Sequence, residues 1–189
     1  MKVVLYGASG TIGSRILQEL VSRRTSSDGR GPSPGEGDCA RGADAAISAY
    51  APPPNDAGKL VEATRTILQG LTDAGVRRFI MVGGAGSLEV APGMQLMDAP
   101  DFPEMWKPYA IAHRDALAVL RSANVDWTNF SPAALIEPGE RTGKFRLAKD
   151  TLVTDSKGES RISAEDYAAA LVGELERPQY IRQRLTVAY

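Results

Sequence analysis

The chain has one cysteine and one histidine among its 189 residues, Cys39 and His113. A single cysteine excludes an intramolecular disulfide and a thiolate metal cluster, and a single histidine excludes a metal site with several imidazole ligands. No apolar run approaches the roughly 20 residues that cross a bilayer. Because 22 basic residues face 23 acidic ones, the bulk charge indicates neither nucleic acid nor an anionic membrane as a partner.

The length fits a single domain that covers residues 1–189. Within it, residues from about 133 to 189 are expected to add small elements on the substrate side. The first predicted strand begins at Lys2, which leaves no room for a signal peptide, so we expect a cytoplasmic protein.

The most informative stretch follows that first strand directly. It has the pattern G-x-x-G-x-x-G and consists of Gly7, Ala8, Ser9, Gly10, Thr11, Ile12 and Gly13. Glycines let a backbone turn sharply and approach a pyrophosphate, and the following helix offers free N–H groups and a partial positive charge to that anion. The context of strand, turn and helix predicts a nicotinamide dinucleotide at this turn.

Strands and helices alternate along the rest of the chain, which predicts an α/β fold around a mainly parallel, doubly wound sheet of the Rossmann kind. Helices are expected over residues 11–24, 55–74, 109–122 and 163–176, with Asn55 or Asp56 capping the second and Gly75 ending it. Further strands are expected at residues 43–50, 78–84, 125–130, 146–147, 151–154 and 184–189. Residues 85–105 are expected to form a long loop that shapes the substrate site.

Residues 25–42 do not fit this alternation. They contain no Val, Ile, Leu, Phe, Tyr or Trp, so they cannot bury enough apolar surface to offset their ordering entropy, and we expect a loop. The second and third strands of the fold are therefore expected to be missing. A deletion, a damaged reading frame, or residues absent between 24 and 43 would each explain this.

The chain resembles the atypical short-chain dehydrogenase/reductase superfamily, and within it the NAD(P)H-binding, NmrA-like group that includes NADH-flavin reductases and biliverdin reductase B-like enzymes. The resemblance rests on the glycine turn and on four further stretches, residues 43–49, 75–87, 127–133 and 161–168. It implies NAD or NADP as cofactor, with a flavin as one substrate. The acidic residue that would hold the adenosine ribose has no counterpart after a predicted strand. Arginines are available for a 2′-phosphate, which favours NADP; they are Arg23, Arg24, Arg30 and Arg41.

The superfamily uses a tyrosine and a lysine four residues apart on one helix, together with an earlier serine. Tyr109 and His113 match that spacing, so they share a helical face, but histidine replaces lysine. Ser87 follows the glycines at 83–86 and is the candidate for holding a substrate carbonyl. The alternatives are that Tyr109 and His113 are a packed surface pair and that Ser87 is a turn hydroxyl.

Ligands of open α/β sheets bind beyond the carboxyl ends of the strands. Two predicted strand ends should therefore flank the nicotinamide, namely Ser48, Ala49 and Tyr50, and Val82, Gly83 and Gly84. A third, Ser131, Pro132 and Ala133, resembles the cofactor-side turn of the family. In the long loop, Phe102, Met105 and Trp106 either roof a flat acceptor or pack as a hydrophobic lid or subunit contact.

Three functions are compatible with these residues. The first is an NAD(P)H-dependent oxidoreductase that transfers hydride to a flavin, quinone-like or other small conjugated acceptor. The others are a non-catalytic dinucleotide sensor and a defective or engineered scaffold. The expected partners are a small-molecule substrate and a second copy in a homodimer, with no nucleic acid, membrane or metal.

Overall fold

The computed structural model describes residues 1–23, 26–28, 40–53 and 55–189. A seven-stranded sheet forms its centre, in the order β2-β1-β3-β4-β7-β11-β9. Every pair is parallel except β11 with β9. The strands are β1 (Lys2–Tyr6), β2 (Ser26–Asp28), β3 (Ala45–Ser48), β4 (Arg78–Val82), β7 (Asp126–Ser131), β9 (Arg146–Ala148) and β11 (Gln183–Ala188). This confirms the predicted α/β Rossmann-like fold.

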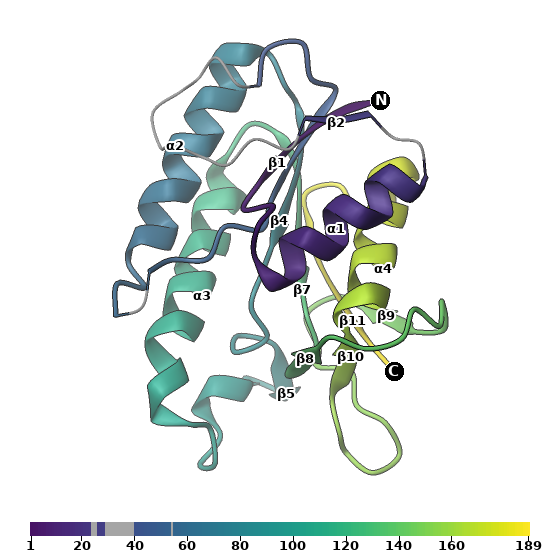
Figure 1. Ribbon diagram of the computed structural model, residues 1–189. Helices are drawn as coiled ribbons and strands as arrows, with labels where there is room; N and C mark the ends of the chain where they lie inside the picture. Colours follow the sequence, from purple (N-terminus) through teal and green to yellow (C-terminus); the bar gives the residue numbers. More distant parts are fainter. Residues whose placement is uncertain (24–25, 29–39, 54) are drawn as a thin grey trace.

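Helices cover both faces of the sheet (Figure 1). The pair α1 (Thr11–Ser22) and α4 (Ala164–Glu176) covers one face, and the pair α2 (Lys59–Ala74) and α3 (Lys107–Ser122) covers the other. Alternate residues of β4 and β7 point to opposite faces, as strand geometry requires, so Ile80 and Phe130 join one core while Phe79 and Trp127 join the other. The two apolar cores hold the sheet between the helix pairs.

The helix ends follow the local sequence with one exception. Gly75 ends α2 at φ 72°, and the Ser163 hydroxyl accepts a hydrogen bond from the Asp166 amide at the start of α4. The predicted cap of α2 is wrong: the helix begins at Lys59 after Gly58, and Asn55 lies outside it at φ 66°. Asn tolerates that left-handed conformation, so it serves a turn here.

The expectation of a strandless loop at 25–42 is wrong at its start. Ser26–Asp28 pairs with β1 in parallel, Val4 opposite Asp28. Three polar residues extend the sheet because the main-chain hydrogen bonds of β1 are available there, whatever the side chains. Residues 40–42 form a turn, as expected, whereas residues 25 and 29–39 lie outside the described residues.

Smaller elements interrupt the predicted loops. A hairpin of β5 (Glu89–Ala91) and β6 (Met94–Gln95) and two short 3-10 helices, Leu96–Asp98 and Glu104–Trp106, occupy the long loop, and β8 (Leu135–Glu137) pairs in parallel with β10 (Arg161–Ser163). The strand predicted at 151–154 is wrong, because only Thr151 forms a bridge there, with Glu89. None of the helices in the described ranges is long and apolar enough to traverse a bilayer.

Candidate functional site

The glycine turn lies between the end of β1 and the start of α1. Gly7 has φ 79°, and a Cβ atom there would come within 2.5 Å of the Ala49 carbonyl oxygen. A Cβ at Gly13 would come within 2.0 Å of the Gly7 carbonyl oxygen. Both positions therefore exclude any side chain. Gly10 differs, since its nearest neighbour to a Cβ would be 3.6 Å away.

The start of α1 is open to an anion. Gly10 precedes the first helical residue, Thr11, and no side chain caps the helix. The first amides of α1 therefore keep their hydrogen-bonding capacity, and the helix dipole adds positive potential. The turn predicted to bind phosphate is thus uncapped at the start of α1, and Ala49, just after β3, packs against it.

The end of β3 lies beside the glycine turn. The Ala49 amide donates to the Tyr6 carbonyl at 2.8 Å, which continues the pairing of β3 with β1. The Ser48 hydroxyl is buried and accepts from the Tyr50 amide at 3.4 Å, while Tyr50 is half-buried against the α2–α3 core. The Ser48 hydroxyl therefore supports the backbone at Tyr50, and Tyr50 itself is partly accessible.

Gly83 and Gly84 follow β4 and let two polar side chains pack directly beneath them. A Cβ at Gly83 would lie 2.5 Å from Asn129 Oδ1, and one at Gly84 would lie 2.8 Å from His113 Cγ. Val82 is half-buried on the opposite face of the sheet. The two glycines thus bring β4, β7 and α3 together at the edge where a nicotinamide would lie.

The end of β7 is buried within the protein. Ser131 is fully buried and Ala133 is 1% exposed. The Ser131 hydroxyl accepts from Arg184 Nε at 3.1 Å, and the Pro132 carbonyl accepts from the Thr186 hydroxyl at 3.4 Å. Ser131 and Ala133 therefore expose almost no surface, side chain or main chain, to a cofactor in this conformation.

Tyr109 and His113 lie on one face of α3, as their spacing predicts, but they have different neighbours. The Tyr109 hydroxyl accepts from the Asn55 amide at 3.2 Å, and its ring tilts against Trp106 with 5.9 Å between centroids. His113 packs on Gly84, and its Nδ1 atom is buried with no hydrogen-bond partner within the described part of the chain. Tyr109 thus joins α3 to the loop after β3.

Burial and the nearby Arg184 guanidinium lower the pKa of His113 to about 4. At pH 7 the imidazole is neutral, so it has no cationic form from which to donate a proton, and it cannot reproduce the fixed charge of the superfamily lysine. A hydrogen bond from the neutral ring to a ribose hydroxyl stays available to it.

Ser87 is buried, 6% exposed, and its hydroxyl faces into the protein, where it accepts from Arg184 Nη2 at 3.1 Å. This placement favours the turn-hydroxyl role over direct contact with a substrate carbonyl. Of the long-loop aromatics and methionines, Met105 is 71% and Trp106 53% exposed, while Phe102 is half-buried. Met105 and Trp106 thus form an exposed apolar surface beside Tyr109.

Sequence reasoning missed Arg184, which lies at the centre of this region. It was assigned only to the last strand. The signal was available: Arg184 alternates with Leu185, which belongs to an apolar core, so a strand here must turn the arginine to the other buried face. A charged residue at a core-facing position of a central strand is uncommon without a specific partner.

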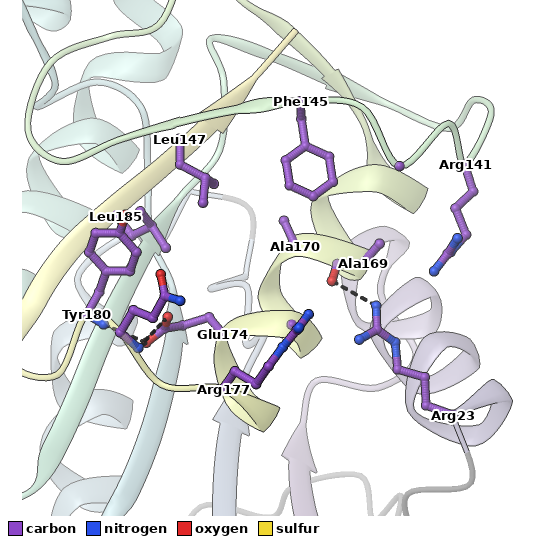
Figure 2. Close-up of a pocket in the computed structure, with 13 residues that line it drawn as sticks. Arg23, Arg141, Phe145, Leu147, Ala169, Ala170, Glu174, Arg177, Tyr180 and Leu185 are labelled. Atoms are coloured by element: carbon purple, nitrogen blue, oxygen red, sulfur yellow. Dashed lines mark hydrogen bonds between the residues drawn. The ribbon is translucent and has the colours of Figure 1, made fainter.

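A separate cavity of about 440 Å³ opens on the α4 face (Figure 2). Phe145 and Leu147 point into it from one side, and three arginines border it. Two of these are neutralised, because Arg23 pairs with Glu19 and Glu176, and Arg141 pairs with Glu19. None of the glycine-turn residues lines this cavity. Arg23 is therefore engaged away from the turn and is not available for a 2′-phosphate.

A parallel sheet, a glycine turn at a helix start, and strand ends that meet beside it define a dinucleotide-binding domain. The comparison with known families makes this specific: residues 38–178 match the NAD(P)H-binding family. The chain belongs to this family of atypical short-chain dehydrogenases/reductases. The matched region begins after the glycine turn, so the turn is independent support.

Solved structures agree over the whole chain. A protein from Burkholderia pseudomallei, described as a "putative exported protein", is 43% identical with a TM-score of 0.92, and each chain is covered completely. A "putative epimerase" from Bacteroides thetaiotaomicron is 39% identical with a TM-score of 0.90, over 100% of this chain and 96% of that one. SP1627 of Streptococcus pneumoniae TIGR4, a "putative NADH-flavin reductase", is 34% identical with a TM-score of 0.88, over 100% and 99%.

A further relative is YwnB of Bacillus subtilis (strain 168), described as an uncharacterized protein. It is 36% identical over 208 aligned residues, covering 99% of this chain and 98% of that protein. The aligned length exceeds the 189 residues of this chain, so the relative has residues that this chain lacks.

Proposed function

We propose that this protein is an NAD(P)H-dependent reductase that transfers hydride to a flavin, quinone-like or other small conjugated acceptor. The observation that carries the proposal is the uncapped start of α1 behind a turn in which Gly7 and Gly13 exclude any side chain. The description of the 34% identical pneumococcal protein as a "putative NADH-flavin reductase" supports this acceptor class. The neutral His113 supports it too, because hydride transfer to a flavin needs orientation more than a positioned cation.

In this proposal the chain's own residues bind and orient. The amides at the start of α1 hold the pyrophosphate, and the segments that follow β4 and β7 border the nicotinamide. The bound nicotinamide supplies the hydride. The exposed apolar surface of Met105 and Trp106 lies beside Tyr109, where it would cover a flat acceptor or contact a second subunit. Dependence on NAD(P)H favours a cytoplasmic location, while the description of the Burkholderia protein points to export.

We propose that NADH binds more tightly than NADPH, against the preference drawn from the arginines. Asp28 is the last residue of β2, opposite Val4 of β1. In Rossmann folds an acidic residue type at the end of this strand favours NADH, because a carboxylate accepts from a ribose 2′-hydroxyl and repels a 2′-phosphate. Titration of the purified protein with each nucleotide should give a lower Kd for NADH, and Asp28→Ser should reduce that preference at least about fivefold.

The neighbouring Ser27→Ala variant is the control, because it leaves the carboxylate in place. A wild type that binds neither nucleotide would overturn both this preference and the reductase proposal. Binding without oxidation by riboflavin, a benzoquinone or a carbonyl compound would favour the sensor function instead.

Tyr109→Phe tests whether the phenol supplies a proton. A general acid contributes about 10²–10⁴-fold to a step that needs one, and a flavin or quinone can take its proton from water. We therefore expect turnover with riboflavin or a benzoquinone to fall less than threefold, and any turnover of a carbonyl compound to fall at least about 100-fold. Steady-state kinetics with NADH would measure both.

Asn55→Gly is the matched control, because it keeps the amide that donates to Tyr109 and changes only the side chain. An equal, large loss with all acceptors would show that Tyr109 takes part in every reduction, and would contradict this expectation.

A further inference from the structure

Arg184 is a buried cation whose partners are all neutral. It is 6% exposed, and its guanidinium donates to four oxygens: the Ser131 hydroxyl, the Ser87 hydroxyl, and the Ser87 and Gly84 carbonyls, at 2.8–3.2 Å. Within the described ranges no carboxylate lies at ion-pairing distance from it. Burial lowers its pKa to about 10, although the Asp150 and Glu89 carboxylates raise the pKa from beyond that distance. Burying a cation without a paired carboxylate is costly, so the four hydrogen bonds of Arg184 must contribute a stabilisation that a neutral side chain would not.

The four bonds connect β11 with the end of β7 and with the segment that follows β4. Arg184 starts on β11, passes the end of β7 at Ser131, and reaches the segment after β4 from Gly84 to Ser87. Three of its bonds go to that segment, at both of its ends. A planar guanidinium suits this arrangement, since its donors diverge in a rigid fork that can address several acceptors at once.

The segment from Gly84 to Ser87 has few other attachments of its own. Its internal turn is closed by the Leu88 amide on the Ala85 carbonyl, and the Met97 amide donates to Gly86. Gly86 also packs on Ala110 of α3, where a Cβ would come within 2.4 Å. This segment connects the nicotinamide edge at Gly83 with the long loop that borders the acceptor.

We propose that Arg184 is a positioning residue that fixes the Gly84–Ser87 segment, and through it the acceptor side of the site. The effect on acceptor binding rests on the proposed reductase function, whereas the fixing of residues 84–87 by Arg184 does not. Arg184 bonds to Gly84 and Ser131 on the proposed nicotinamide side but not to the phosphate turn, so it should affect acceptor binding more than overall cofactor affinity.

Arg184→Met removes all four bonds and keeps an unbranched side chain. Hydrogen exchange followed by mass spectrometry should show amides of residues 84–88 exchanging at least tenfold faster than in the wild type. The Kd for NADH, which is set mainly at the glycine turn, should rise less than KM for riboflavin or a benzoquinone, which should rise at least tenfold. Arg184→Lys keeps the charge but not the fork, and should give an intermediate exchange rate.

Arg182→Met is the matched control, because it removes the same charge two residues earlier from a side chain that is 48% exposed and bonded to Asn124. It should leave exchange of residues 84–88 unchanged. If Arg184→Met does not fold, Ser87→Ala removes one bond to the segment and should accelerate the same amides, more than Ser131→Ala does.

Unchanged exchange of residues 84–88 in Arg184→Met would overturn the proposal, as would faster exchange with an unchanged acceptor KM. A wild type that binds NADH without reducing any acceptor would instead count against the reductase function, while the exchange experiment would still decide whether Arg184 holds the segment.

Discussion

Replacing Gly13 with alanine is expected to destabilise the apoprotein and to abolish measurable NAD(P)H binding. The added Cβ would lie 2.0 Å from the Gly7 carbonyl oxygen, and this neighbour is backbone, which cannot rotate away as a side chain could. Forcing an extra carbon into such a contact costs about 3 kcal/mol, which for a chain of this size lowers Tm by roughly 6–12 °C. Thermal unfolding and nucleotide titration would measure the two effects.

Gly10→Ala is the matched control in the same turn. Its Cβ would have no protein atom nearer than 3.6 Å, so the Tm of the apoprotein should stay within about 1 °C of the wild type. Its affinity for NADH should nevertheless fall, because the middle glycine of this motif lets the backbone approach the pyrophosphate. Retention of both stability and nucleotide affinity in Gly13→Ala would contradict this account of the turn.

The sheet, its helices and the glycine turn were predictable because each has a strong local cause. Ile16 and Leu20 recur at helical spacing, Gly75 ends α2 in the left-handed region that glycine favours, and the glycine turn stands directly between a strand and a helix. These features depend on near neighbours in the chain, so the sequence displays them directly.

The elements that sequence reasoning missed depend on partners far along the chain. The three polar residues of β2 form a strand only because the edge of β1 is available for pairing, and their side chains do not predict a strand. The same holds for β8 and β10, which pair across 26 positions. The contacts of Arg184 span 53–100 positions, so strand alternation could predict its burial but not its partners.

The site prediction was limited in the same way. Local spacing correctly placed Tyr109 and His113 on one face of α3, but it could not show that Asn55 approaches one and Gly84 the other. Ionisation depends on burial, and burial is a property of the fold. His113, which stands where the superfamily has a lysine, is neutral because of its burial, and a sequence motif does not show burial.

That neutral histidine should make the stability of the protein depend on pH. An unfolded chain binds a proton at His113 below pH 6.5, its ordinary pKa, whereas the folded protein, with a pKa of about 4, does not. Stability should therefore decrease as the pH falls from 6.5 towards 4. The full difference corresponds to about 3 kcal/mol, and about 2 kcal/mol of it should be lost between pH 6.5 and pH 5.

Urea unfolding at several pH values would measure this loss, and His113→Gln supplies the comparison because glutamine stays neutral throughout. In that variant the slope between pH 6.5 and pH 5 should largely disappear, since carboxylates titrate mainly below this range. The wild-type chain has a single histidine, so one NMR titration gives its pKa without ambiguity. A midpoint near 6.5 would show that the His113 ring is accessible in solution. The ring would then have a cationic form near neutral pH and could act as a proton donor.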